Sequence, residues 1–362
     1  MVEHSLQHSV LPAPNSPVAI RRRAWREFKD RLARYGVAVG GVSVIFAIVL
    51  IFFYLLYVVM PLFYGADIES KAQYSTKISN SSHLTLNEYN DVALTLDMQG
   101  KVEFFDANNG QSMLDVALPL PEQAKIVSFS KGAASTGVFA YGFDDGTTLV
   151  FQQDYKISYP EGNTRKITPL IRYPLGEKTQ VVDVKGQALR LLSVQSNSDQ
   201  TSLVGLTQDN RVVLKSLIRE ENFMDEDAFT IEEKTAEIKL DASETITHLQ
   251  LDIDQRELYL ADSHGFISYF DVTNIEAPRL IQKIDQWFPV RDANNNYTIH
   301  NVRSFHDQKS AIVAISPEYA RKGFLALDSS GQLAIYHTTA HRTLLVEPLV
   351  TGDNAVMAIS PR

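Results

Sequence analysis

Few side chains in this sequence have the spacing of a catalytic or metal-binding motif. His337 and His341 are four residues apart, which lets two imidazoles share one metal ion when both lie on a helix. His337, however, ends an alternating apolar run that predicts a strand. Asp106 to Gly110 (DANNG) has the polar start of a calcium loop but lacks the spacing to a bidentate glutamate, and it is more typical of an Asx turn. We expect no metal site from either pattern.

Nucleophilic and phosphate-binding motifs are equally sparse. Ser128 and Lys131 match Ser-x-x-Lys, a pattern too short to indicate a hydrolase by itself. The sequence contains no phosphate-binding glycine loop, nucleotide-binding signature or nucleophile elbow. It also has no cysteine, which excludes disulfides, thiolate metal sites and cysteine nucleophiles. We expect neither enzyme activity nor a cofactor.

Charge is unevenly distributed along the 362 residues. Residues 1–34 carry seven basic and three acidic side chains, a net charge of +4, and residues 35–66 carry none. Since the whole chain has a net charge of −9, residues 67–362 must carry −13. An acidic domain of this kind is a poor candidate for binding nucleic acid, which needs clustered positive charge.

The uncharged run at residues 35–66 predicts a transmembrane helix. A helix needs about 20 apolar residues to cross the hydrocarbon, and its backbone groups are satisfied internally. We expect Pro61 to end or kink the helix. The alternatives are a buried core helix, for which the run is unusually long, and a cleaved signal peptide, whose apolar region is about 7–15 residues.

Basic residues directly before the span predict a cytoplasmic N-terminus, so the chain after about Asp67 is exported, in a Gram-negative cell to the periplasm. Within residues 1–34, apolar side chains spaced by three and four predict a basic amphipathic helix that lies on the membrane surface. A simple topology signal is the alternative. Gly36 and Gly40 form a small-xxx-small pair. The residues predicted to lie at the membrane interface are basic or aromatic: Arg21, Arg22, Arg23, Trp25, Arg26, Phe28, Arg31, Arg34, Tyr57 and Tyr64.

Residues 67–362 change to a period of two, which predicts an all-β domain. Five hairpins recur, each with Gly or Asn at a tight turn, where positive φ is tolerated. They span residues 92–106, 138–152, 203–216, 258–271 and 324–337, with turn residues Gly100, Gly146, Asn210, Gly265 and Gly331.

The second strand of these hairpins repeats apolar residues two and four positions after the turn, and mostly aromatic ones five positions after it. Phe105-Asp106 and Phe270-Asp271 are similar to the Trp-Asp dipeptide of WD40 propeller blades. The turns are 46 to 66 residues apart, wider than the 40–45 of a regular propeller of this type. We therefore expect an irregular, WD40-like β-propeller, with a β-sandwich or separate meanders as the alternative. Asp183–Gly186 predicts a further hairpin turn, and Arg219–Glu237 an insertion or outer loop.

A short repeat stands near the end of the sequence. Ile312–Pro317 (IVAISP) leads into the Gly331 hairpin, and Val356–Pro361 (VMAISP) repeats it. A blade that begins there and is not completed would leave an open sheet edge. We expect the chain to be a fragment of a longer protein.

The segment from Arg21 to Ser70 resembles the opening of the long-form permease subunit of the phosphate-specific ABC transporter of gammaproteobacteria. The resemblance lies in Lys29-Asp30-Arg31-Leu32, Phe52-Phe53-Tyr54-Leu55, Val59–Phe63 and Gly65-Ala66-Asp67, and in the order of basic start, one helix and β-repeats. It implies a periplasmic propeller-like insertion after the first helix. The remaining permease helices and the loop that couples to the ATPase are not in this sequence, so no substrate-contacting residue is carried over.

The resemblance implies a part in inorganic phosphate import, with other permease subunits or the other permease half, an ABC ATPase subunit and a periplasmic phosphate-binding protein as partners. The β domain would then be a docking or regulatory module. The alternative is a single-pass anchored propeller that serves as a scaffold for envelope proteins. A sensor is the weakest hypothesis, because about 34 cytoplasmic residues leave no room for an output domain.

Overall fold

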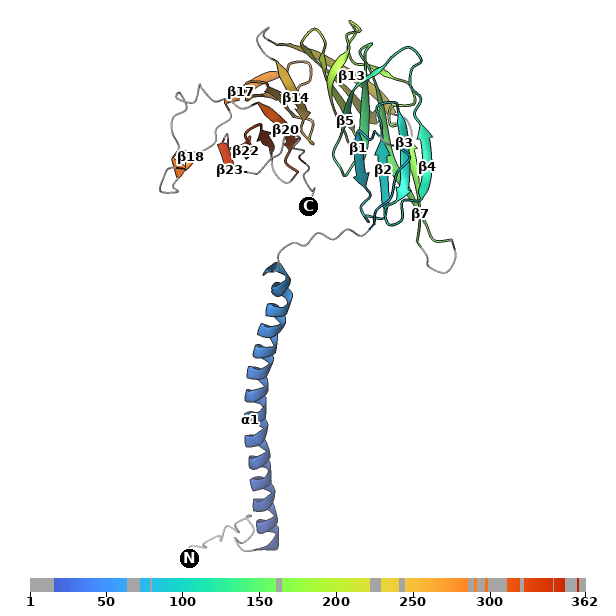
Figure 1. Ribbon diagram of the computed structural model, residues 1–362. Coiled ribbons are helices and arrows are strands. Elements are labelled where there is room, and N and C mark those ends of the chain that lie inside the picture. Colours follow the sequence, from blue (N-terminus) through green and yellow to red (C-terminus); the bar gives the residue numbers. More distant parts are fainter. Residues whose placement is uncertain are drawn as a thin grey trace, which may run out of the picture. The chain divides into compact units, whose positions relative to one another are not determined.

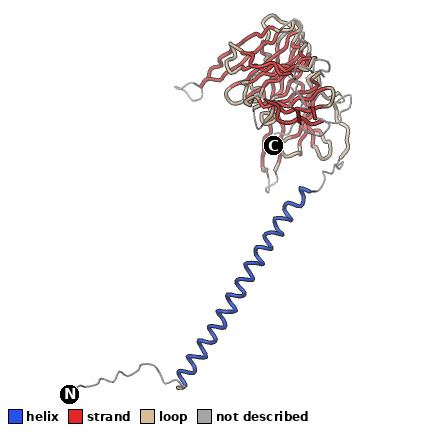
Figure 2. Tube along the Cα trace, turned by 90° about the vertical axis from the view of Figure 1, so that its left-hand side faces the viewer, coloured by secondary structure: helices blue, strands red, loops and turns tan. Residues whose placement is uncertain are grey.

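The computed structural model describes residues 16–63, 72–78, 80–160, 165–221, 229–240, 245–285, 290–291, 297–298, 311–319, 322–340, 342–348 and 357. These form two compact units, Met1–Lys71 and Ala72–Arg362, each of which is treated by itself (Figure 1). In the described part of the first unit the structure is helical, and in that of the second it consists of strands and their connections (Figure 2). The expected combination of one apolar N-terminal helix and an all-β domain is confirmed.

The first unit is the helix α1 (Pro17–Val59), followed by a 3-10 turn, η1 (Met60–Phe63). The helix begins where the side chain of Ser16 accepts a hydrogen bond from the Ala19 N–H, with Pro17 in the first turn. The α-helix ends at Val59, and Met60 keeps helical dihedral angles as the chain enters η1, which contains Pro61. Its 43 residues run without a break through the predicted boundary at residues 34 and 35. At 1.5 Å per residue, α1 is about 64 Å long.

Four-stranded antiparallel meanders make up most of the second unit, and sequence order is spatial order within each. Sheet A contains β1 (His83–Leu86), β2 (Val92–Leu96), β3 (Lys101–Asp106) and β4 (Ser112–Ala117). Sheet B contains β5 (Ile126–Lys131), β6 (Val138–Phe143), β7 (Thr147–Ser158), β8 (Lys166–Arg172) and, beside β7, β9 (Gln180–Val181).

Three further meanders follow in the chain. Sheet C contains β10 (Leu189–Ser196), β11 (Gln200–Thr207), β12 (Arg211–Glu221) and β13 (Phe229–Lys239). Sheet D contains β14 (Ile246–Leu251), β15 (Glu257–Asp262), β16 (Phe266–Asp271) and β17 (Arg279–Asp285). Sheet E contains β20 (Ile312–Pro317), β21 (Gly323–Asp328), β22 (Gln332–His337) and β23 (Arg342–Pro348), after a short pair, β18 (Val290–Arg291) and β19 (Tyr297–Thr298).

The five predicted hairpins are the central strand pairs of these five sheets. Their turn residues have the positive φ that was expected, from +61° at Asn210 to +85° at Gly331. In sheets A, D and E, a buried aspartate begins the turn and its carboxylate caps two backbone N–H groups. Asp97, for example, accepts from Gln99 and Lys101 at 2.8 and 3.0 Å. The same arrangement recurs at Asp262 and Asp328. These carboxylates satisfy donors that the tight turn leaves unpaired.

Four apolar cores lie between successive sheets. Each core joins one sheet to the next in the chain: A to B around Phe104, B to C around Val150, C to D around Leu214 and D to E around Tyr259. Within the described residues none of these cores joins sheet E back to sheet A. The sheets repeat as propeller blades do, but no closed ring is described, and the propeller remains a prediction.

Residues 72–78 and 80–82, the first described after the helix unit, lie across the face of sheet A that points away from sheet B. Tyr74 packs edge-on against Phe105, with ring centroids 5.8 Å apart. The Lys77 N–H donates to the buried Glu103 carboxylate at 3.0 Å. The Ser81 and Thr95 hydroxyls are 2.6 Å apart. This segment, the strap, therefore covers one end of the row of sheets with aromatic and polar contacts.

Two local predictions are wrong. Asp183–Gly186 is a turn but not a hairpin, since β9 before it pairs with β7 and β10 after it pairs with β11. Much of Arg219–Glu237 is strand rather than loop, because β12 extends to Glu221 and pairs with β13 from Phe229 onward. β7 is long because it has two partners on one side: β9 pairs with its first residues and β8 with its last.

Candidate functional site

The residues predicted to lie at a membrane interface fall on α1, apart from Tyr64, which lies outside the described residues. The basic and aromatic ones of the first half are all exposed: Arg21, Arg22, Arg23, Trp25, Arg26, Phe28, Arg31 and Arg34. The Trp25 and Phe28 rings stack at 5.7 Å, and Lys29 lies 5.4 Å above the Trp25 ring. Tyr57 is exposed near the other end of the helix. The arrangement suits the headgroup region of a lipid surface.

The second half of α1 is apolar on all sides, and its side chains are left exposed by the residues of the unit that the structure describes. A window of 18 residues has a mean hydropathy of 2.9, and none of it is buried. Side chains such as Phe52 and Leu55 remain more than half exposed. Exposed apolar surface on this scale marks contact with a membrane or a partner. The helix is long and apolar enough to cross a membrane, a property that signal sequences near an N-terminus share.

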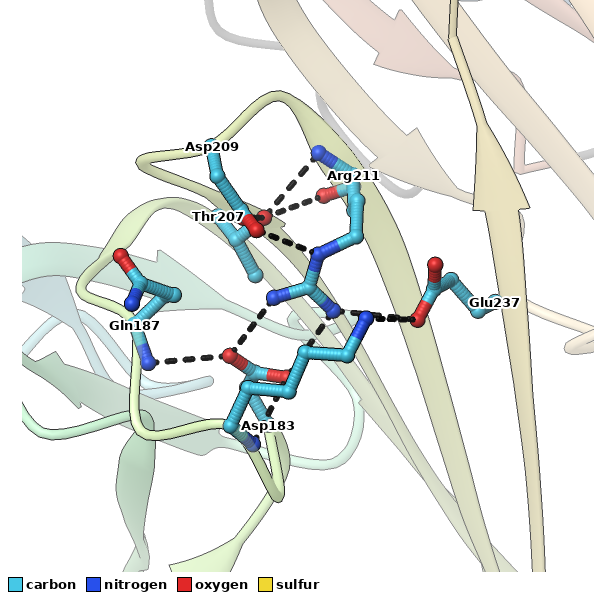
Figure 3. A network of polar contacts seen from close by, with 7 residues as sticks. Asp183, Gln187, Thr207, Asp209, Arg211 and Glu237 are labelled. Carbon is cyan, nitrogen blue, oxygen red and sulfur yellow. Dashed lines mark hydrogen bonds and ion pairs between the residues drawn. The ribbon is translucent and has the colours of Figure 1, made fainter.

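In the described part of the β unit, a cluster of charged side chains surrounds Arg211 at the start of β12 (Figure 3). Its guanidinium is nearly buried and binds Asp183 through two nitrogens, at 3.0 and 3.1 Å. Nε donates to Asp209 at 2.7 Å, and Nη1 also donates to Glu237 at 3.1 Å. Lys185 contacts the same Glu237 oxygen at 3.2 Å. All three guanidinium nitrogens thus donate to carboxylates of the cluster.

The cluster lowers the pKa of its carboxyl groups. Burial pushes the pKa of Asp183 up, but hydrogen bonds from Arg211 and from the Gln187 and Lys185 N–H groups hold it below its usual value. The hydrogen bond from Arg211 is the main reason that the pKa of Asp209 is lowered. Asp183 lies in the β9–β10 connection and Arg211 in sheet C, so the cluster fixes the link between sheets B and C. Its satisfied geometry indicates a structural role.

A second polar cluster joins sheets D and E. The Glu257 side chain on β15 is buried and accepts from the hydroxyls of Tyr259 at 2.5 Å and Tyr269 at 3.0 Å. Thr338, in the turn after β22, also donates to this carboxylate, at 3.0 Å. Burial raises the pKa of both tyrosines, which therefore stay protonated as donors. Three hydroxyl donors compensate for the burial of the carboxylate.

A pocket of about 170 Å³ lies between the β14–β15 turn and the β20–β21 connection. Asp252, Asp254, Glu318 and Lys322 are the charged side chains among the described residues that line it. Burial raises the pKa of Asp252 to about 6, against two hydrogen bonds from the Glu257 and Arg256 N–H groups. Three of the four charged side chains among these described residues are therefore carboxylates.

Two of the patterns that could have carried chemistry have their residues in the described part of the chain, and neither assembles into a site there. Ser128 is buried and Lys131 exposed on β5, and side chains three apart on a strand point to opposite faces. Asp106 begins an Asx turn, accepting from the Asn108 N–H at 2.7 Å. His337 accepts from the Ala340 N–H at 3.3 Å, and His341 lies outside the described residues. In the described part of the chain, no group of three metal-ligating side chains is close enough to hold an ion.

Sequence reasoning missed the Arg211 and Glu257 clusters. The sequence held one signal for the Arg211 cluster, an aspartate three residues before a turn glycine. Asp183 precedes Gly186 at this spacing, as Asp97 precedes Gly100. That pattern predicts a capped turn but says nothing about which arginine reaches it from another sheet.

Comparison with known proteins identifies no family. No family model and no curated protein sequence matches the chain. Among solved structures, the crystal structure of Chaetomium thermophilum Raptor is similar with a TM-score of 0.40 and 10% sequence identity. The similarity covers 76% of this chain and 21% of that one, so this chain spans about a fifth of the Raptor chain.

Proposed function

We propose that α1 anchors this chain in the inner membrane, with the N-terminus in the cytoplasm and the β unit in the periplasm. The observation that carries the proposal is the fully exposed apolar half of α1, directly preceded by exposed arginines. Exposed apolar side chains of this extent are stable in lipid and costly in water. The arginines favour retention of the N-terminal end on the cytoplasmic side.

The proposed role of the anchored chain is in inorganic phosphate import, as part of the permease of a phosphate-specific ABC transporter. The resemblance of Arg21–Ser70 to that permease supports this assignment. The partners would be other permease subunits or the other permease half, an ABC ATPase subunit and a periplasmic phosphate-binding protein. The residues described here hold no pathway for the anion, so we assign the β unit no part in conducting phosphate.

The β unit would serve as a docking or regulatory module of that transporter. Rigid meanders joined by loops suit partner binding. Direct capture of phosphate is disfavoured by the net charge of −13 after residue 66.

Orientation can be tested with single cysteines, since the natural chain has none. Ser5→Cys and Ser329→Cys would be placed separately in the full chain and exposed to a membrane-impermeant maleimide in intact spheroplasts. We expect residue 329 to be labelled in intact spheroplasts. Residue 5 should be labelled only after lysis. Labelling of residue 5 in intact spheroplasts would contradict the proposed topology.

The transport assignment can be tested by affinity purification from solubilised membranes of the source organism. We expect the full chain to bring down an ABC ATPase subunit and the phosphate-binding protein. The control keeps the β unit but replaces residues 17–63 with an unrelated single span, and it should lose the ATPase. If the full chain brings down neither protein while remaining in the membrane, the anchored scaffold replaces the transport assignment.

A further inference from the structure

α1 is about twice as long as the hydrocarbon core of a membrane is thick. Its 43 residues span about 64 Å, whereas about 20 residues cross a core of about 30 Å. The uncharged residues 35–59 form its second part, and residues 17–34 form a charged first part. Given the proposed anchor, on which this inference rests, the charged part continues on the cytoplasmic side.

The axis of the helix decides where this charged part lies. α1 runs without a break through residues 34 and 35, so both parts follow one axis (Figure 1). With the hydrocarbon edge as early as Tyr35, Trp25 lies ten residues further, or about 15 Å along the axis. A tilt of about 40° leaves about 11 Å along the membrane normal, and each headgroup layer is about 5–8 Å thick. Trp25 therefore stands beyond the headgroups, and the charged part projects from the membrane instead of lying on it.

One face of the projecting part is apolar. Trp25, Phe28, Leu32 and Tyr35 follow one another at intervals of three and four residues, which places them within an arc of about 80°. All four are more than half exposed. The same interval continues into the uncharged part, where an apolar groove lies between residues 38 and 50. We call Trp25, Phe28, Leu32 and Tyr35 the cytoplasmic stripe.

Basic side chains border the cytoplasmic stripe on both sides. Arg22 and Lys29 lie on one side of it and Arg31 on the other, and all three are exposed. None of them forms an ion pair with another described residue. The acidic side chains of this part, Glu27 and Asp30, lie further round the helix. An apolar stripe with charged borders is how one helix pairs with another, and the charges at the borders select the partner.

These charges decide which kind of helix fits. A second copy anchored in the same membrane would pair in parallel, and Arg21, at the start of the stripe, would face its own counterpart. Carboxylates, in contrast, would complement the basic borders. We propose that the cytoplasmic stripe pairs with a helix of a partner protein, and that carboxylates border the apolar face of that helix.

Fluorescence quenching tests where the stripe lies. Trp25 and Trp287 are the two tryptophans of the chain, so Trp287→Phe leaves Trp25 as the single probe in the full chain. In nanodiscs that contain anionic phosphatidylglycerol, we expect acrylamide to quench Trp25 and lipids with brominated acyl chains to leave it unchanged. The matched variant carries Trp25→Phe, Trp287→Phe and Phe46→Trp, and the brominated lipids should quench position 46.

The two positions separate the possible failures. If the brominated lipids quench both position 46 and Trp25, the charged part lies on the lipid surface and the pairing proposal is overturned, while the anchor stands. If the brominated lipids leave position 46 unquenched, the anchor itself is overturned.

Two synthetic peptides test the chemistry of the partner. Each contains about four heptads with leucine at the apolar positions, and the bordering positions are glutamate in one peptide and lysine in the other. In zwitterionic nanodiscs, which leave both membrane faces accessible, the glutamate peptide should bind the full chain. It should shift the emission of Trp25 to shorter wavelength and protect it from acrylamide. Equal binding of the two peptides, or binding of neither, would overturn the proposal.

Two triple variants locate the contact on the helix. The first replaces the three bordering basic side chains by glutamine: R22Q, K29Q and R31Q. The second removes the same charge from the opposite side of the helix: R23Q, R26Q and R34Q. The first should weaken binding of the glutamate peptide about tenfold, and the second about twofold or less. Equal losses would mean that net charge alone attracts the peptide, which contradicts pairing along the stripe.

Photo-cross-linking in cells of the source organism tests the natural partner. With benzoylphenylalanine in place of Phe28, the full chain should form a protein adduct whose linked peptide has an apolar helical face bordered by Asp and Glu. The same probe in place of Asp30, further round the helix, should not form this adduct. Lipid adducts alone at position 28, or a linked peptide without bordering carboxylates, would overturn the proposal.

Discussion

Arg211 holds Asp183 through two parallel hydrogen bonds, although the two residues lie in different elements and are 28 positions apart. Asp183 belongs to the connection that leaves sheet B, and Arg211 begins β12 of sheet C. A bidentate pair fixes both distance and orientation. The pair therefore sets where the chain enters sheet C after leaving sheet B.

Arg211→Met should strongly destabilise the β unit, because it leaves the buried Asp183 carboxylate without its cation. Removing one partner of a buried pair costs about 3–5 kcal/mol. Lys185→Met is the matched control: Lys185 is an exposed partner in the same cluster, and its loss should cost less than about 1 kcal/mol. Urea-unfolding midpoints of the full chain in detergent measure both. Equal midpoints for the two variants would contradict the structural role of the pair.

The sequence predicted the central hairpins because period-two patterns and turn residues such as Gly265 are local signals. The Arg211–Asp183 pair could not be predicted, because nothing near Asp183 in the chain indicates its partner. The strap was not predicted for a related reason: its described residues form no strand, and Lys77 and Ser81 contact side chains of sheet A that are distant in the sequence. Contacts between sheets depend on how the sheets stack, which alternation within a strand does not encode.

Gly146→Ala should destabilise the β unit more than Gly176→Ala. Both glycines have positive φ, +79° and +83°, so each substitution adds about 1–2 kcal/mol of backbone strain. At Gly146 the new methyl group would also lie 2.8 Å from the Asp183 carbonyl oxygen, whereas at Gly176 no atom lies within 4 Å. The difference in unfolding midpoint isolates the close approach of the β9–β10 connection to sheet B. Similar midpoints would show that this connection can move aside.

His83 should make the β unit less stable as the pH falls from about 6.5 to about 4. Burial, and secondarily the charge of Lys131, lower its pKa to about 4, whereas the unfolded chain takes up the proton near pH 6.5. Between these values the unfolded state binds more protons, so stability rises with pH. His83→Phe, which suits the neighbouring Phe129 and Phe139 rings, should flatten this dependence. Unfolding midpoints at pH 4, 5, 6 and 7 measure the change.

Asp252 should act in the opposite direction over much of the same range. Burial raises its pKa to about 6, above the usual value of 3.8, so the folded state binds more protons between these values. This contribution to stability is fully present below about pH 4 and is lost as the pH rises through about 6. Asp252→Asn should therefore steepen the rise of stability with pH that His83 causes. If Asp252→Asn and His83→Phe change the slope in the same direction, one of the two assignments is wrong.

Thr338→Val should loosen the attachment of sheet E to sheet D. The Thr338 hydroxyl donates to the buried Glu257 carboxylate at 3.0 Å, and a hydrogen bond to a charged group contributes about 1.5–3 kcal/mol. Hydrogen exchange of the β21 and β22 amides in the full chain should then accelerate, while exchange in β2 and β3 of sheet A stays unchanged. Thr339→Val is the matched control, since the side chain of Thr339, the next residue in the chain, is exposed. Unchanged exchange in sheet E, or equal acceleration in sheets A and E, would contradict a local role for the Thr338–Glu257 contact.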